Sequence, residues 1–109
     1  MTERRYRVIV RGRFDGLDEA ARDRLRAEAA DHDLLTARFT DEGTLTYDAR
    51  LDAFQHRVLV LVDEGPEEED VALTAGELAA VEHLEAAGLG YRDLRASATC
   101  LDDVKIRRR

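Results

Sequence analysis

Three stretches of the chain alternate between apolar and polar positions, and they predict its main strands. Residues 5–12 (RYRVIVRG) carry a tyrosine and two valines on one face, and residues 54–62 and 91–101 repeat the pattern. From Val58 onward, both faces of the 54–62 stretch are apolar. This pattern is typical of a strand that is covered on both sides.

The region before residue 54 is predicted to form a hairpin. Residues 35–40 alternate, with Phe39 on the inward face. A tight turn follows, and Gly43 can close it because glycine tolerates the left-handed backbone conformation. Leu45 and Tyr47 are then expected on the same face as Phe39.

Two helices are predicted between the strands, at residues 18–30 and 67–87. Asp18 can accept a backbone N–H at the start of the first helix, whose apolar positions recur every four residues. In the second helix, the apolar spacing places Val71 and Leu78 on the face that packs against the core.

The resulting order, β-α-β-β-β-α-β, predicts an α+β fold. It is a two-layer sandwich of the ferredoxin-like type, with an antiparallel or mixed sheet and both helices on one face. Two interpretations of residues 34–62 remain open: a meander of three strands, or one long bulged strand that reverses once and gives the four-stranded ferredoxin order. We favour the meander, because pairing Tyr47 with Phe54 in the second case leaves Leu35 and Ala37 without partners.

Length and composition fit one small domain. The chain has 109 residues, of which 44% are hydrophobic, so we expect a single domain over residues 1–109 with a partly disordered tail at 101–109. The net charge of −7 opposes binding to nucleic acid or to an anionic membrane. Cys100 is the one cysteine, and no apolar run is long enough for a signal peptide or a membrane span, which predicts a cytoplasmic protein.

Two family resemblances rest on short motifs. The segment VIVRGRFDGL resembles the phosphate-binding loop of acylphosphatases, which place an arginine shortly after the second glycine and an asparagine on a later strand. Here the corresponding position is Ala20 and the chain has no asparagine, so the resemblance implies the fold and not the activity. With its GRFDGL loop and TDEGTLTYD hairpin, the whole chain resembles an uncharacterised family of small actinobacterial proteins, which implies no particular activity.

The candidates for chemistry are few. His56 and Tyr47 are predicted on the inward face at one end of the core, where they would act as general base and hydrogen-bond donor. A histidine that touches water at the end of the sheet is the simpler interpretation. His32 is expected to lie at a helix C-terminus, His83 to be exposed, and Cys100 to be an inert core thiol. No ligand spacing predicts a metal site, and we predict no cofactor.

The sheet face away from the helices is predicted to be an interface. It mixes arginines with apolar side chains and offers no aromatic residue for stacking on RNA bases. The residues expected to form the interface are Ile9, Arg11, Arg57, Leu59 and Leu61. Exposed apolar strips of this kind mark interaction surfaces, and a back-to-back homodimer would cover them.

These features predict a non-catalytic homodimer that binds a partner protein or a small ligand. The alternative is a small cofactor-independent enzyme of the dimeric α+β barrel type that acts on an aromatic or polyketide-like substrate. The two differ in whether His56 lies beside a cavity.

Overall fold

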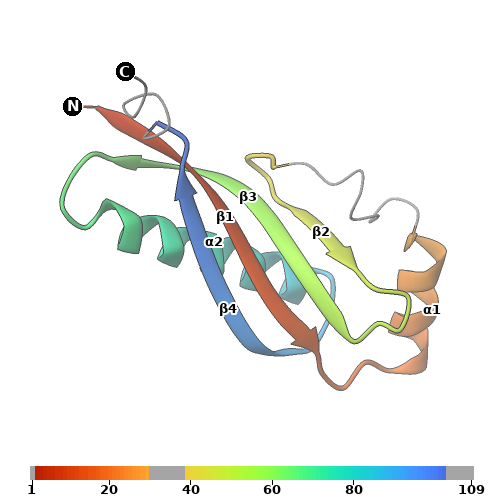
Figure 1. The fold of residues 1–109 in the computed structure, drawn as a ribbon. Helices are drawn as coiled ribbons and strands as arrows, with labels where there is room; N and C mark the ends of the chain where they lie inside the picture. Colours follow the sequence, from red (N-terminus) through yellow and green to blue (C-terminus); the bar gives the residue numbers. More distant parts are fainter. Residues whose placement is uncertain (1, 30–38, 103–109) are drawn as a thin grey trace.

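A computed structural model describes residues 2–29 and 39–102 of the chain (Figure 1). Its elements are β1 (Glu3–Phe14), α1 (Glu19–Ala27), β2 (Thr44–Tyr47), β3 (Ala53–Asp63), α2 (Glu68–Ala86) and β4 (Tyr91–Cys100). The predicted α+β class is confirmed, because helical structure packs against a single antiparallel sheet. His32, which was expected at a helix C-terminus, and residues 103–109 of the predicted tail lie outside the described residues.

The strands form one antiparallel sheet in the order β2-β3-β1-β4. Within the described residues the central region holds two strands, β2 and β3. The predicted strand at 35–40 lies mostly outside these residues, and at its described end Thr40 forms a single parallel bridge with Val58. Gly43 has φ 93°, so the predicted turn is present, although it joins Thr40 to β2 without an antiparallel hairpin.

The inner face of the sheet packs against α2, which lies behind it in Figure 1. Alternation along the strands is confirmed: the even-numbered β1 and β3 residues Tyr6, Val8, Val10, Phe54, Val58 and Val62 are buried. The prediction for α2 was wrong by one helical position. Val71 and Leu78 are more than half exposed, whereas the buried stripe is Ala72, Gly76, Ala80 and Leu84.

Small side chains explain why α2 turns this stripe inward. A Cβ atom at Gly76 would overlap the Val8 side chain, so the helix approaches the sheet more closely than any larger residue permits. Close packing of the helix backbone on β1 leaves no void between the helix and the sheet, which is how protein interiors are stabilised. The glycine that weakens the isolated helix therefore fits the tertiary structure.

Helix α1 lies at one end of the sheet beside β2, not across the sheet face (Figure 1). Asp18 caps the helix as predicted, because its Oδ1 accepts a hydrogen bond from the Ala21 N–H at 2.8 Å. Leu25 packs in the apolar cluster that contains Leu84, and its carbonyl accepts a hydrogen bond from the Tyr47 hydroxyl at 2.5 Å. Both helices therefore pack against inner-face side chains, α2 along the sheet and α1 at the end that carries β2.

Strand β1 extends beyond its predicted end at residue 12. It runs on to Phe14, so the loop that follows begins later than expected. Beyond β4, the Leu101 N–H donates to the Arg5 carbonyl at 2.8 Å. No helix within residues 2–29 and 39–102 has the length and hydropathy to span a membrane.

Candidate functional site

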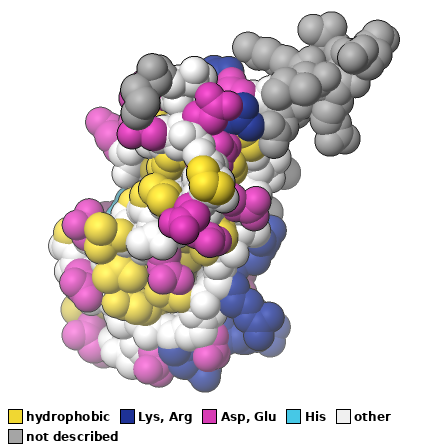
Figure 2. Space-filling view, turned by 90° about the vertical axis from the view of Figure 1, so that its left-hand side faces the viewer, with side chains coloured by type: hydrophobic (Ala, Val, Ile, Leu, Met, Phe, Trp, Pro, Cys, Tyr) yellow, Lys and Arg dark blue, Asp and Glu magenta, His cyan; other side chains and the backbone are white. Residues whose placement is uncertain are grey.

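The sheet face opposite α2 carries the odd-numbered side chains of β1 and β3. Cross-strand register places the predicted interface residues on this open face, namely Ile9, Arg11, Arg57, Leu59 and Leu61. Figure 2 shows the consequence for charge, since arginine side chains gather along one side of the molecule while acidic side chains occupy much of the rest of the view. The open face is therefore the basic surface of an acidic protein.

One half of the open face is apolar. Leu61 is 59% exposed, and the half-buried Leu59 and Ile9 follow it along the β1–β3 pair. The arginines of this half are engaged. Arg5 donates to Asp102 through its backbone N–H at 2.8 Å and its Nη2 at 3.2 Å, so the residues that follow β4 are tied to β1.

Phe39 lies on this open face, which corrects its predicted place in the core. The Arg7 and Arg57 guanidinium carbons lie 5.4 and 5.6 Å from the centre of its ring. Cation–π contacts of this kind stabilise by about 0.5–1 kcal/mol at exposed sites. Alternation placed Phe39 inward, but residue 40 bridges to β3 in parallel, so the register of a β2 hairpin does not apply to it. The expectation of a face without aromatic residues was therefore wrong.

The other half of the open face is basic. Arg11 on β1 lies directly opposite Arg95 on β4, and Arg13 lies opposite Arg92. In a regular strand a spacing of three would put Arg92 and Arg95 on opposite faces. The register shifts there, beside Asp93 with φ 58°, and the extra residue brings both arginines opposite outward-facing β1 positions.

Charge compensation is uneven within this basic half. Arg13 Nη1 lies 2.9 Å from Asp52 Oδ2, and Arg92 lies within 4.0 Å of a carboxylate oxygen of Asp15. Among the described residues, Arg11 and Arg95 form no ion pair with a carboxylate. Like charges directly opposite each other on neighbouring strands are destabilising, so this pair favours an anion between or beside its guanidinium groups.

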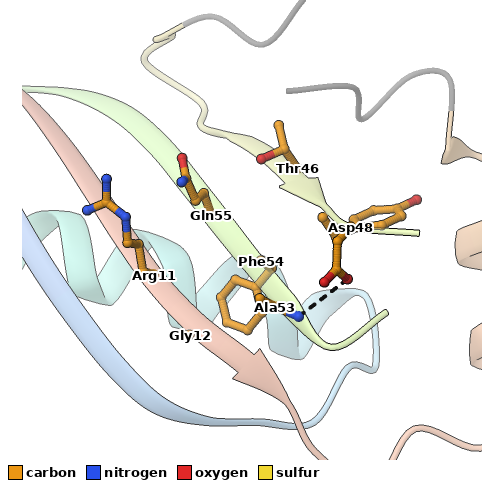
Figure 3. A pocket seen from close by; sticks show the side chains of 8 residues that line it. Arg11, Gly12, Thr46, Asp48, Ala53, Phe54 and Gln55 are labelled. Carbon is orange, nitrogen blue, oxygen red and sulfur yellow. Dashed lines mark hydrogen bonds between the residues drawn. The ribbon is translucent and has the colours of Figure 1, made fainter. Parts of the chain in front are cut away.

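A cavity of about 320 Å³ adjoins Arg11. Register places Arg11, Gln55 and Thr46 side by side on β1, β3 and β2, so a guanidinium, a carboxamide and a hydroxyl line one rim (Figure 3). The remaining lining is Gly12, Tyr47, Asp48, Ala53 and Phe54. This is the arrangement of a small-molecule site, in which a largely apolar hollow carries a few polar groups that orient the ligand.

Two contacts fix the polar groups of this cavity. The Gln55 side-chain oxygen accepts hydrogen bonds from Arg57 Nε and Nη2 at 3.4 and 3.3 Å, so its NH₂ group is the part of the carboxamide that can donate to a ligand. Asp48, at the opposite rim, accepts the backbone N–H groups of Asp52 and Ala53 at 2.9 and 3.4 Å. The Asp48 carboxylate is therefore held by the β2–β3 turn.

His56 and Tyr47, the predicted catalytic candidates, do not share this cavity. Tyr47 lines it, but its hydroxyl is bound to Leu25 as described above. His56 lies opposite Leu45 on the inner face, is fully buried, and contacts the His83 ring with centroids 5.1 Å apart. Its expected position near Leu45 is confirmed, whereas the simpler interpretation of a water-exposed histidine was wrong.

The environment of His56 is unusual for a core residue. Neither ring nitrogen has a hydrogen-bond partner among the described residues, and Nε2 faces the backbone of Gly43. Burial, together with the nearby His83, lowers the pKa of His56 from 6.5 to about 4. A neutral imidazole with a pKa this low is a poor proton acceptor near neutral pH.

A second polar cluster ties β1 to the start of α2. Glu68 accepts hydrogen bonds from Tyr6 Oη at 2.6 Å, Arg4 Nε at 2.9 Å and the Gly65 N–H at 3.1 Å. These bonds, the Tyr6 bond foremost, lower the pKa of Glu68, and burial raises the pKa of Tyr6. None of these residues lines the cavity beside Arg11.

Among the residues that line the cavity, sequence reasoning had singled out Arg11 and Tyr47 and missed the others. Thr46, Gln55 and Ala53 carry no motif, and the register of three strands is what assembles them. Cys100 is a buried free thiol, as predicted. Within the described residues, no cluster of three or more His, Cys, Asp or Glu side chains is arranged to hold a metal ion.

Fold and site together define a small α+β sandwich domain with one open, partly basic sheet face. The chain belongs to DUF6204, a family of unknown function whose profile matches residues 1–109. This membership confirms the prediction of an uncharacterised family; the resemblance of the GRFDGL loop to acylphosphatases stays a prediction. No match was found among curated proteins or among solved structures.

Proposed function

We propose that the chain is a non-catalytic binding domain of ferredoxin-like type that acts as a homodimer and takes a small ligand on its open sheet face. The strand order β2-β3-β1-β4, with each pair antiparallel, supports this plan, because it is what two interlocked β-α-β units produce. The lone Cys100 supports a reducing compartment such as the cytoplasm. An actinobacterial source rests on the arginine- and alanine-rich composition.

The open face, with its separate apolar and basic halves, carries the proposal. Leu61 is the most exposed large apolar side chain of the described residues, and Leu59 and then Ile9 follow it along this face. Removing about 100 Å² of such surface from water contributes about 2.5 kcal/mol. A flat sheet face with this composition is covered best by another sheet face.

The charges of the apolar half permit a symmetric contact. Arg5 is neutralised by Asp102, while Arg7 and Arg57 are held over Phe39. A twofold axis through this half would bring the apolar halves together and leave the uncompensated pair near Arg11 toward the edges of the interface. A stable interface buries about 800 Å² per partner, so Phe39 and the stems of the neighbouring arginines belong to it as well.

The dimer is tested by two matched substitutions. Leu61→Asp places a carboxylate in the proposed interface, and Leu78→Asp places one on the outer side of α2, where the side chain is similarly exposed at 56%. We expect light scattering after size exclusion to show a dimer for the unsubstituted protein and for Leu78→Asp, and a monomer for Leu61→Asp. A monomeric unsubstituted protein at tens of micromolar, or a monomer produced by Leu78→Asp alone, would contradict the proposal.

The enzyme alternative has less support. It requires His56 and Tyr47 to reach a substrate together, yet His56 is fully buried and the Tyr47 hydroxyl is bound to Leu25. Binding without turnover needs neither group. The proposal of a ligand-binding domain therefore stands on the cavity beside Arg11, which is open to solvent without a conformational change.

A further inference from the structure

We propose that the cavity beside Arg11 binds a small organic anion with an apolar body, such as an aromatic carboxylate. The inference rests on the ligand-binding function proposed above and names the class of ligand. It follows from two uncompensated arginines on β4 and β1, two neutral donors on β3 and β2, and the apolar hollow that Arg11 and these donors line.

The charge of the ligand follows from Arg11 and Arg95. These residues face each other across the β1–β4 ladder, and neither has a carboxylate partner among the described residues. The nearby Arg13 and Arg92, by contrast, are paired with acidic residues. An anion bound at Arg11 would offset the repulsion between the two guanidinium groups, and the bond would be charge-assisted.

The donors beside Arg11 indicate a planar acid group. Gln55 lies directly opposite Arg11 and presents its NH₂ group, because its oxygen accepts from Arg57. Thr46 follows on β2, opposite Gln55. A carboxylate has two acceptor oxygens, so it can bind the guanidinium with one and the neutral donors with the other. The row formed by Arg11, Gln55 and Thr46 is therefore matched to one acid group and not to a larger polyanion.

The rest of the cavity indicates the body of the ligand. Ala53 occupies the position where a larger side chain would fill the hollow, and most of the cavity lining is apolar. The volume of about 320 Å³ admits one or two aromatic rings but not an extended polymer. Asp48 at the far rim repels a second negative group, which selects against dianions whose charges lie at both ends.

In the experiment, the full chain is titrated with three probes, and ¹⁵N–¹H correlation spectra monitor binding at each step. Benzoate is the test ligand, benzamide is its neutral isostere, and inorganic phosphate is an anion without an apolar body. We expect saturable benzoate shifts at the amides of Thr46, Ala53 and Gln55, and affinities for benzamide and phosphate weaker by about tenfold or more. The benzoate affinity should fall with added salt, because the charges are exposed to solvent.

Three variants separate the causes. Arg11→Gln should weaken benzoate binding by about tenfold or more, and Ala53→Leu should abolish it without any change of charge. Arg50→Gln removes the same charge from an exposed turn residue that does not line the cavity, and it should bind as the unsubstituted protein does. Thermal unfolding of each variant establishes that the fold is retained.

Several outcomes would overturn the inference. These are the absence of saturation by 10 mM benzoate, equal binding of benzamide or of phosphate, or an equal loss in Arg50→Gln and Arg11→Gln. The cavity lies within a single chain, so the monomer produced by Leu61→Asp should still bind benzoate. A failed dimer test with intact benzoate binding therefore refutes the homodimer alone, and the reverse result refutes the anion site alone.

Discussion

His56 offers the sharpest test of how the core is built, because its burial has a measurable effect on stability. The residue is fully buried, neither of its ring nitrogens has a hydrogen-bond partner within residues 2–29 and 39–102, and its pKa is lowered to about 4. The perturbation we choose is His56→Leu, which removes the titratable group and both unpaired nitrogens while keeping a similar side-chain volume.

The sign and the size of the effect follow from the two pKa values. In the unfolded chain His56 protonates near its ordinary value of 6.5, whereas in the folded protein it stays neutral down to about 4. Between these values the unfolded state binds more protons, so the free energy of unfolding falls as the pH is lowered through this window. One pKa unit corresponds to about 1.4 kcal/mol, which gives a loss of about 3 kcal/mol by pH 4.

The assay is urea unfolding followed by far-UV circular dichroism at several values between pH 7 and pH 4. Carboxylates also titrate near the acid end of this window, so the informative quantity is the difference between the unsubstituted protein and His56→Leu. We expect the variant to lose about 3 kcal/mol less than the unsubstituted protein on going from pH 7 to pH 4. At pH 7 its stability should be equal or greater, because unpaired buried polar atoms are costly.

His83→Gln is the control for this experiment. It removes the smaller cause of the lowered pKa and leaves the burial, so most of the pH dependence should remain. If the unsubstituted protein and His56→Leu lose the same stability between pH 7 and pH 4, His56 is not a neutral buried residue. The assignment of its low pKa to burial would then be refuted.

Three further predictions concern the packing of the helices. Gly76→Ala should destabilise the protein by about 1–3 kcal/mol in urea unfolding, because the new methyl group overlaps Val8 even though alanine has the better helix propensity. Gly65→Ala, with open space around it, should have little effect. A more stable Gly76→Ala would contradict the close approach of α2. Asp18→Ala should cost about 1 kcal/mol through loss of the N-cap, and the exposed Asp23→Ala should cost less, with equal losses arguing against the cap. Tyr47→Phe should cost about 1 kcal/mol by leaving the Leu25 carbonyl without its partner, whereas Tyr91→Phe, which breaks an exposed bond of 3.3 Å to Glu85, should be nearly neutral in the same assay.

Local patterns in the sequence were sufficient for most of the secondary structure. Strict alternation located β1, β3 and β4, and Asp18 marked the start of α1, because these signals act between residues close in the chain. The predicted positions of Phe39 and of the buried stripe on α2 were wrong, because they depend on contacts between residues far apart in the chain. The face that Phe39 takes depends on a bridge between Thr40 and Val58, and the orientation of α2 depends on the fit of Gly76 against Val8.

The candidate site was predictable only in part. Arg11 and the apolar strip on the outer face follow from alternation within single strands. The pairing of Arg11 with Arg95 and the row that continues through Gln55 to Thr46 depend on register, and the irregularity near Asp93 shifts that register. Burial of His56 likewise required contacts with β2 and α2, which no local pattern encodes.

By itself, the sequence determined that this protein is a small α+β domain with one apolar and one arginine-bearing sheet face, because side-chain alternation and helix capping are properties of neighbouring residues. The tertiary structure decided which side of α2 faces the sheet, where α1 packs, and which arginines meet across the strands. These features depend on close packing and cross-strand register between segments far apart in the chain, and both are set only when the whole core assembles.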